Sequence, residues 1–422
     1  MADPTVYIEQ TIRSVTDAAR LVEDLGPVRA ATLHDGLPGT ALLLAALSRT
    51  DRHLAAAVAS QWDTAAKLLT HTQPAGIYSG SGALATSLIL GSGYLPDSAS
   101  QHAAVTHATA WLSARAQGLA QAQTQRHRDS RPGTPWAIYD AIQGLAGIGR
   151  ILLAADQAGQ RTAAAPGLTA ALTTLTTMIN APARPHPGWW APSPSHAPQP
   201  VQPQPLCGAA TTGIAHGIAG PLAFIAAAHT AARTVPGQTT AIRTASQWLL
   251  TWRNPGGTWP DHIPSHALDQ GPQPAAGPGR RDSWCYGNTG IGHALILAAT
   301  ALHDTDLYQH GTAALDTVAA RPPDNWDTTG PGLCHGTAGV LLTALQHGHT
   351  ALSRAAEDHT LRLSNQAFSK NPGMLTGTAG TALALADATS MLNHPYGAPW
   401  HVLLLTGTQS TTTLARSKPL GA

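Results

Sequence analysis

Two of the three cysteines in this 422-residue chain occupy the same local pattern, directly before a glycine-rich turn. Cys285 lies in WCYGNTG and Cys334 lies in LCHGTAG, where His335 follows it at once. Two thiolates and an imidazole are good zinc donors, and three protein ligands leave the fourth tetrahedral position open, as in catalytic zinc sites. The pattern therefore predicts a zinc site formed by Cys285, Cys334 and His335. A pair of buried structural cysteines is the alternative.

Four further polar residues stand near comparable glycines and could act on a substrate held at such a site. His216 could transfer protons near neutral pH. Asp140, in the neighbouring repeat, could hold that imidazole or could cap a helix. Arg281 and Tyr286 flank Cys285 in sequence, and a guanidinium beside a metal can stabilise developing negative charge. The alternatives are that Arg281 forms a structural salt bridge and that Tyr286 is a packed aromatic residue.

The glycine turn recurs seven times, each time at the start of an apolar run rich in alanine and leucine. The runs span residues 35–47, 78–90, 142–155, 215–228, 286–299, 334–346 and 375–387. The second of them has Ser79 where the first glycine of the turn would be. Recurrence of such a unit along a chain is typical of repeat architectures.

The composition of the runs predicts helices that are buried on all sides. Segments with one polar face, such as 14–26, 54–69 and 240–252, predict amphipathic outer helices. An open superhelix would need polar capping repeats at its ends, which neither terminal copy provides. We therefore predict an all-α protein with a single domain over residues 1–422. Its fold would be an α/α toroid, a double-layered ring of about seven inner and seven outer helices.

Two irregular insertions interrupt the repeats. Residues 181–206 are so rich in proline that no regular helix is expected, which leaves an excursion, an extended flap or a disordered insertion. Residues 253–283 form a second long loop, which we expect to be ordered because it ends in Arg281 and Asp282 beside the predicted site.

Composition excludes several classes of function. Lys plus Arg (24) against Asp plus Glu (23) gives a formal charge of +1, which offers no electrostatic basis for binding nucleic acid or an anionic membrane. Three cysteines, without a secretion signal or a long apolar stretch, predict a soluble cytoplasmic protein with no membrane insertion.

Cys207 has no partner and is interpreted as structural or incidental. The other histidines, among them His34, His293, His347 and His349, are expected to lack matching partners.

Four motifs resemble those of the lanthionine synthetase C-like family, the lantibiotic or lanthipeptide cyclases, and fall in the same order. They are YDAIQGLAG, GIAHGIAG, RDSWCYGNTG and LCHGTAG, and the resemblance extends from HDGLPG to APWHVLLLTG. It implies an α/α toroid in which Cys285, Cys334 and His335 hold zinc. The fourth ligand would be water, displaced by a cysteine thiol of the substrate. Asp140, His216, Arg281 and Tyr286 match the remaining active-site positions.

The implied reaction adds a peptide cysteine thiol to dehydroalanine or dehydrobutyrine, which closes a lanthionine or methyllanthionine thioether ring. We assign delivery of the proton to the α-carbon to His216, oriented by Asp140. Bulk water is the alternative source of this proton. Arg281 would steady the enolate oxygen and Tyr286 would line the pocket. The substrate would be a dehydrated ribosomal precursor peptide, leader plus core, supplied by a separate dehydratase, with a transporter as a possible further partner.

Two other functions stay open on the sequence alone. A glycosidase would need paired carboxylates, but the acidic residues near the turns are essentially Asp35, Asp140 and Asp282, and no suitable pair is evident. A non-catalytic relative could use zinc to bind a thiol-bearing peptide or glutathione.

Overall fold

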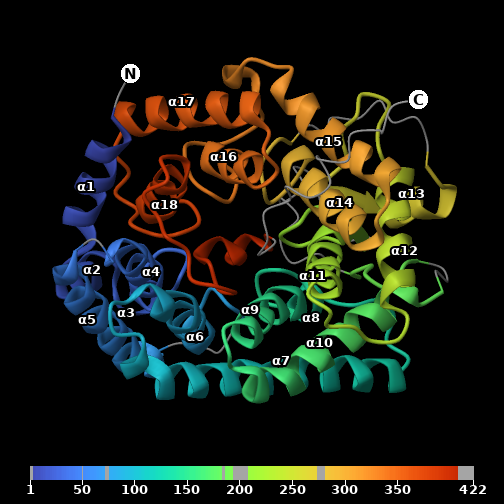
Figure 1. The fold of residues 1–422 in the computed structure, drawn as a ribbon. Coiled ribbons are helices and arrows are strands. Elements are labelled where there is room, and N and C mark those ends of the chain that lie inside the picture. The colour runs from blue at the N-terminus through green and yellow to red at the C-terminus, as the bar shows by residue number, and fades with distance from the viewer. Residues whose placement is uncertain are drawn as a thin grey trace, which may run out of the picture.

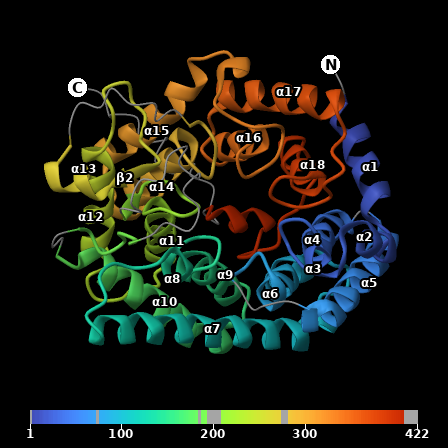
Figure 2. The ribbon, with the colours of Figure 1, turned by 180° about the vertical axis from the view of Figure 1, so that it is seen from behind.

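The helices form a closed double ring, which confirms the predicted toroid (Figures 1 and 2). The computed structural model describes residues 3–49, 51–71, 76–182, 186–192, 208–272 and 281–406. In that part of the chain there are eighteen α-helices and one two-stranded sheet. None of these helices combines the length and the apolar composition that crossing a membrane requires.

Seven helices form the inner layer, and each begins at one of the predicted glycine turns. Their side chains are buried almost throughout, and all eleven residues of the first inner helix are buried. This burial explains why the predicted runs lack a polar face. The inner helices are α4 (Leu37–Leu47), α6 (Gly80–Gly91), α9 (Leu145–Gln157), α11 (Ala219–Thr230), α14 (Asn288–Leu302), α16 (Thr337–Gln346) and α18 (Thr378–Ala388).

Seven outer helices back them, and the first outer helix closes the ring by packing on the last inner helix, α18. The outer helices are α1 (Pro4–Val15), α5 (Arg52–Leu68), α7 (His102–Arg128), α10 (Arg161–Asn180), α12 (Gln238–Thr251), α15 (Thr305–Ala319) and α17 (Thr350–Gln366). The single helix predicted for residues 14–26 is wrong. There α1 ends and α2 (Ala18–Leu25) begins, because the Asp17 side chain accepts hydrogen bonds from the amides of Ala19 and Arg20.

The second glycine of each turn is required by a close backbone approach. A Cβ at Gly290 would lie 2.0 Å from the carbonyl oxygen of Trp284, and one at Gly339 would lie 2.1 Å from that of Leu333. No side chain tolerates such a distance. In the second repeat Ser79 is the N-cap of α6, the place that Gly36 takes at the start of α4.

A closed belt of seven backbone hydrogen bonds links the seven turns. Each turn donates an amide to a carbonyl of the next turn, at N···O distances of 2.8–3.4 Å, and the last turn donates to the first. The bonds run from Leu33 to Tyr78, Ile77 to Ile142, Ala141 to Ala215, Ile214 to Cys285, Cys285 to Cys334, Cys334 to Leu375, and Leu375 to His34. The belt puts all seven turns at one mouth of the ring and fixes their order around it.

A segment near the carboxyl end of the described chain fills the centre of the ring (Figures 1 and 2, red). It contains η5 (Trp400–Leu404), all of whose residues are buried. Its carbonyl groups accept hydrogen bonds from side chains on different repeats: Trp284 Nε1 donates to Leu404 at 3.0 Å, and Tyr78 Oη donates to Leu403 at 2.9 Å. The toroid therefore has a packed centre under the mouth.

The insertions add short elements beside the ring. In the first one, the described residues 181–182 and 186–192 contain no helix, as predicted, and Trp189 packs edge-on against Trp248 of α12. Most of the proline-rich stretch and Cys207 lie outside the described residues. Residues 253–272 of the second insertion contain β2 and α13, and residues 273–280 lie outside the described residues. The remaining elements are α3 (Pro27–Ala30), η1 (Leu69–His71), η2 (Ser92–Tyr94), η3 (Ala99–Gln101), α8 (Trp136–Tyr139), β1 (Ala209–Thr211), β2 (His262–Pro264), α13 (Ser265–Gln270) and η4 (Pro323–Asn325).

Candidate metal centre and its surroundings

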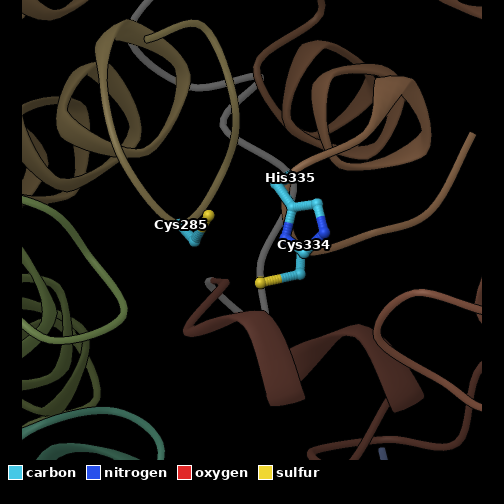
Figure 3. Close-up of side chains that lie close together, drawn as sticks. All are labelled: Cys285, Cys334 and His335. Atoms are coloured by element: carbon cyan, nitrogen blue, oxygen red, sulfur yellow. The ribbon is translucent and has the colours of Figure 1, made fainter. Parts of the chain in front are cut away.

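The three predicted zinc ligands come together at the mouth of the ring. The Sγ atoms of Cys285 and Cys334 and a ring nitrogen of His335 all lie within 4.8 Å of one another. Figure 3 shows the two sulfurs and the imidazole pointing toward one another from the turns before α14 and α16. The belt accounts for this proximity, because the amide of Cys285 donates to the carbonyl of Cys334 at 3.0 Å.

The donor set fits zinc. Tetrahedral zinc with bonds of about 2.3 Å to sulfur and about 2.0 Å to nitrogen holds its ligands roughly 3.5–3.8 Å apart, which lies within the observed limit of 4.8 Å. Two thiolates and one imidazole also match the ligand types that zinc takes in proteins. Cys285 is buried, whereas Cys334 and His335 are partly buried, so the cluster is open toward the mouth.

The two thiols share a proton unequally. The Cys334 thiol donates a hydrogen bond to Cys285, which places the pKa of Cys285 well below its ordinary value, and His335 and Ser283 add to this effect. The same contact raises the pKa of Cys334 well above its ordinary value. Contact with Cys285 likewise raises the pKa of His335. The cluster thus stabilises negative charge at Cys285, which favours binding of a cation.

His216 and Asp140 form a hydrogen-bonded pair beside this cluster. The Nδ1 atom of His216 lies 2.6 Å from Oδ2 of Asp140, whose side chain is only 1% exposed. The other carboxylate oxygen, Oδ1, accepts from the amides of residues 142–144 at 2.7–3.0 Å. One oxygen of Asp140 thus closes the turn before α9 and the other holds the imidazole. The alternative of a helix N-cap is wrong, because the N-cap of α9 is Gly144 and Asp140 is the C-cap of α8.

The short helix α8 positions His216 through three contacts. The indole of Trp136 stacks on the imidazole, with ring centroids 4.8 Å apart and an interplanar angle of 19°. The hydroxyl of Tyr139 donates to the carbonyl of His216 at 2.9 Å, and Asp140 follows directly after the helix. The Nδ1 side of the His216 ring is therefore fixed on Asp140, and one face of the ring is covered by Trp136.

Arg281 lies at the rim, and the residue after it anchors the loop. Arg281 is about half exposed, and its Nε is 3.4 Å from Oδ2 of Asp261. Asp282 is fully buried and accepts a bidentate pair from Arg321 at 2.7 and 2.5 Å. The loop then turns back so tightly that a Cβ at Gly287, where φ is +102°, would lie 1.8 Å from the carbonyl oxygen of Arg281.

Tyr286 connects the two halves of the site. Its ring centroid lies 6.5 Å from that of His216 and 5.9 Å from that of His262. Burial and the negative charge at Cys285 raise the pKa of Tyr286, so the phenol keeps its proton at neutral pH. Because Tyr286 follows Cys285 in sequence, it bridges the metal cluster and the His216–Asp140 pair.

The structure thus brings all seven sequence-predicted site residues to one mouth of the ring. Sequence reasoning missed Trp136, Asp261 and His262, which come from α8 and from the start of β2. Of the histidines left out of the predicted site, His293 Nδ1 lies 2.7 Å from His347 Nε2, and His34 Nε2 lies 3.5 Å from Asp35 Oδ2.

Comparisons with known proteins agree with this picture. The family model for lanthionine synthetase C-like proteins matches residues 27–396. Among solved structures, the chain is similar to nisin cyclase, with a TM-score of 0.78 and 17% sequence identity. That match covers 94% of this chain and 97% of the cyclase. No match was found among curated protein sequences.

Proposed function

This chain belongs to the lanthionine synthetase C-like family, and from that premise we propose that it is a zinc-dependent lanthipeptide cyclase. It would add cysteine thiols of a dehydrated peptide to dehydroalanine or dehydrobutyrine and form lanthionine or methyllanthionine rings. The observation that supports this most is the placement of Cys285, Cys334 and His335 within 4.8 Å of one another beside the His216–Asp140 pair.

Cys285, Cys334 and His335 would hold the zinc ion. When bound, the metal would supply acidification of a substrate thiol, which is otherwise mostly protonated at neutral pH with a pKa of about 8.5. The partly exposed faces of Cys334 and His335 leave room for a peptide sulfur at the open side of the cluster.

His216 would deliver the proton that completes the addition. The thiol sulfur bonds to the β-carbon of the dehydroamino acid, the double-bond electrons move onto the carbonyl as an enolate, and the α-carbon then takes a proton. The buried Asp140 carboxylate would hold the His216 ring through Nδ1, and the imidazole would act as the acid. The thiol loses one proton and the α-carbon gains one, so the product has the mass of the substrate.

Arg281 and Tyr286 would act on the acceptor. The Arg281 guanidinium is exposed enough at the rim to reach a peptide carbonyl and carries fixed donors for the enolate oxygen. Tyr286, whose hydroxyl stays protonated, would line the pocket between the attacking sulfur and His216.

The chemistry of this substrate implies partners. Dehydroalanine and dehydrobutyrine arise from serine and threonine by loss of water, so a dehydratase must act on the precursor peptide first, and a transporter would export the product. Free thiols at a working site fit a reducing compartment, and we place the reaction in the cytoplasm.

The test is a cyclisation assay read by mass spectrometry. A dehydrated peptide carrying a cysteine should lose its reactivity toward a thiol-alkylating reagent without any change in mass, and chelation of zinc should stop this. A peptide that keeps its alkylatable thiol at the uncatalysed rate would contradict the proposal. If the peptide or glutathione bound through its thiol but was not converted, the chain would instead be a thiol-binding relative.

A further inference from the structure

The start of β2 brings two unassigned side chains, Asp261 and His262, against the candidate site. The strand pairs antiparallel with β1, and His262 lies opposite Thr211 in the register. The segment is held further by Thr212, whose amide donates to the carbonyl of Asp261 at 3.1 Å and whose hydroxyl donates to that of Pro260 at 2.7 Å. Since β1 leads directly into the turn that carries His216, the sheet ties the insertion to the site.

Asp261 contacts the guanidinium of Arg281. The pair joins Oδ2 to Nε at 3.4 Å, and among the described residues this is the ion pair found for Arg281. Asp261 is 26% exposed and Arg281 is 48% exposed, so the carboxylate is the more buried partner of the pair. Burial raises the pKa of Asp261, and the positive charge of Arg281 lowers it. Arg281 therefore offsets part of the desolvation cost of the Asp261 carboxylate. A long, half-exposed arginine needs such a partner to keep one orientation.

His262 contacts the ring of Tyr286. The centroids of the two rings are 5.9 Å apart with an interplanar angle of 25°. The ring of Trp136 also lies near His262, with a centroid distance of 6.0 Å. Trp136, His216, Tyr286 and His262 thus form a closed cycle of ring contacts. Burial, with the charges of His216 and Arg281, lowers the pKa of His262 to about 4. The ring is therefore neutral at physiological pH and packs against Tyr286 without adding positive charge.

We propose that Asp261 and His262 are positioning residues for the acceptor half of the site, with Asp261 fixing the Arg281 guanidinium and His262 fixing the Tyr286 ring. This inference rests on the proposed function, in which Arg281 steadies the enolate oxygen. It also gives the second insertion a role, because the two-stranded sheet becomes the platform for this half of the site, as α8 is for His216.

The first test is the kinetic coupling of Asp261 to Arg281. D261N should lower kcat about ten- to a hundredfold with little change in KM and with zinc content unchanged, because misplacing a catalytic group by roughly 1 Å has effects of this size. In an R281K background the same change should cost less than about twofold. The matched control is D269N on α13, an exposed carboxylate of the same insertion, which should leave the rate unchanged. Equal losses in both backgrounds would overturn the proposal.

The second test concerns His262. H262F keeps a flat ring against Tyr286 and should retain most of the activity, whereas H262A should lose about as much as D261N. Similar losses in H262F and H262A would show that ring packing is not what His262 contributes.

A third measurement needs neither zinc nor substrate. Labelling of Arg281 by phenylglyoxal, located by mass spectrometry, should be about two- to fivefold faster in D261N than in the wild type or in D269N, the range expected for loss of a surface ion pair. Equal labelling would mean that Asp261 does not hold Arg281. If the wild type failed to cyclise a dehydrated peptide, the proposed function would fall while this measurement still reported on the contact.

Discussion

The turns of repeats five and six and the turns of repeats seven and one share a backbone arrangement but carry different side chains. All four lie on the belt of hydrogen bonds, yet the first two carry Cys285 and Cys334 where the other two carry Leu375 and His34. The same backbone hydrogen bond recurs at all seven turns, so the side chains determine which turns can bind a metal. Because belt neighbours are in direct contact, two adjacent turns suffice to bring donors within reach of one ion.

The largest effect is expected from replacing the residue before the first glycine of the turn by alanine in each region. His335→Ala should lose most of the bound zinc and slow cyclisation more than about a hundredfold, since even outer-shell partners of a metal cost about ten- to a hundredfold. Thr376→Ala, the matching position of repeat seven, should leave both unchanged. Elemental analysis and the mass-spectrometric assay measure the two quantities. Equal zinc content in both variants would remove His335 from the ligand set.

Two His–Asp pairs at the mouth offer the next contrast. His216 is held by Asp140 at 2.6 Å and stacked on Trp136, whereas His34 lies 3.5 Å from Asp35. We expect His216→Ala to slow cyclisation about 10²- to 10⁴-fold, the usual contribution of a general acid, with zinc retained. His34→Ala should have little effect. A full cyclisation rate and normal ring stereochemistry in His216→Ala would assign the proton to water.

The centre of the ring should respond to pH differently from its mouth. His293 and His401 are buried and His347 is partly buried, and desolvation lowers the pKa values of all three, that of His293 to about 4. Between pH 6.5 and about 4 the unfolded chain binds more protons than the folded one, so stability falls as pH falls through this window. For His293 alone the loss is roughly 3 kcal/mol.

Thermal unfolding of zinc-free protein at pH 7.5 and pH 5 measures this effect without interference from metal release. His293→Asn, which cannot titrate, should flatten the dependence. An unchanged unfolding temperature at the two pH values would show that these histidines are charged in the folded protein.

The smallest expected effect distinguishes the two thiols themselves. With its pKa well below the ordinary value, Cys285 should be the first cysteine alkylated in zinc-free protein near pH 7, severalfold ahead of Cys334, whose pKa is raised. Peptide mapping after brief treatment with iodoacetamide measures the order. Preferential labelling of Cys334 would reverse the assignment of the shared proton.

The sequence predicted the features that recur in every repeat, but it did not predict the contacts between different repeats. Glycine turns before apolar runs indicated the inner helices, and the matched position of Cys285 and Cys334 indicated their proximity. Closure of the ring by α1 on α18 and the separation of α1 from α2 depend on contacts and capping that periodicity does not encode. Asp261 and His262 stayed hidden because their loop has no repeat signal, and only pairing of β2 with β1 brings them to the site.

The most direct test of the account is X-ray absorption at the zinc edge on the purified protein, alone and with a cysteine-containing dehydrated peptide. We predict two sulfur ligands at about 2.3 Å and two nitrogen or oxygen ligands at about 2.0–2.1 Å in the protein alone. Addition of the peptide should bring a third sulfur, and Cys334→Ala should remove one. A protein that binds no zinc, or a sulfur count that neither the variant nor the peptide changes, would contradict it.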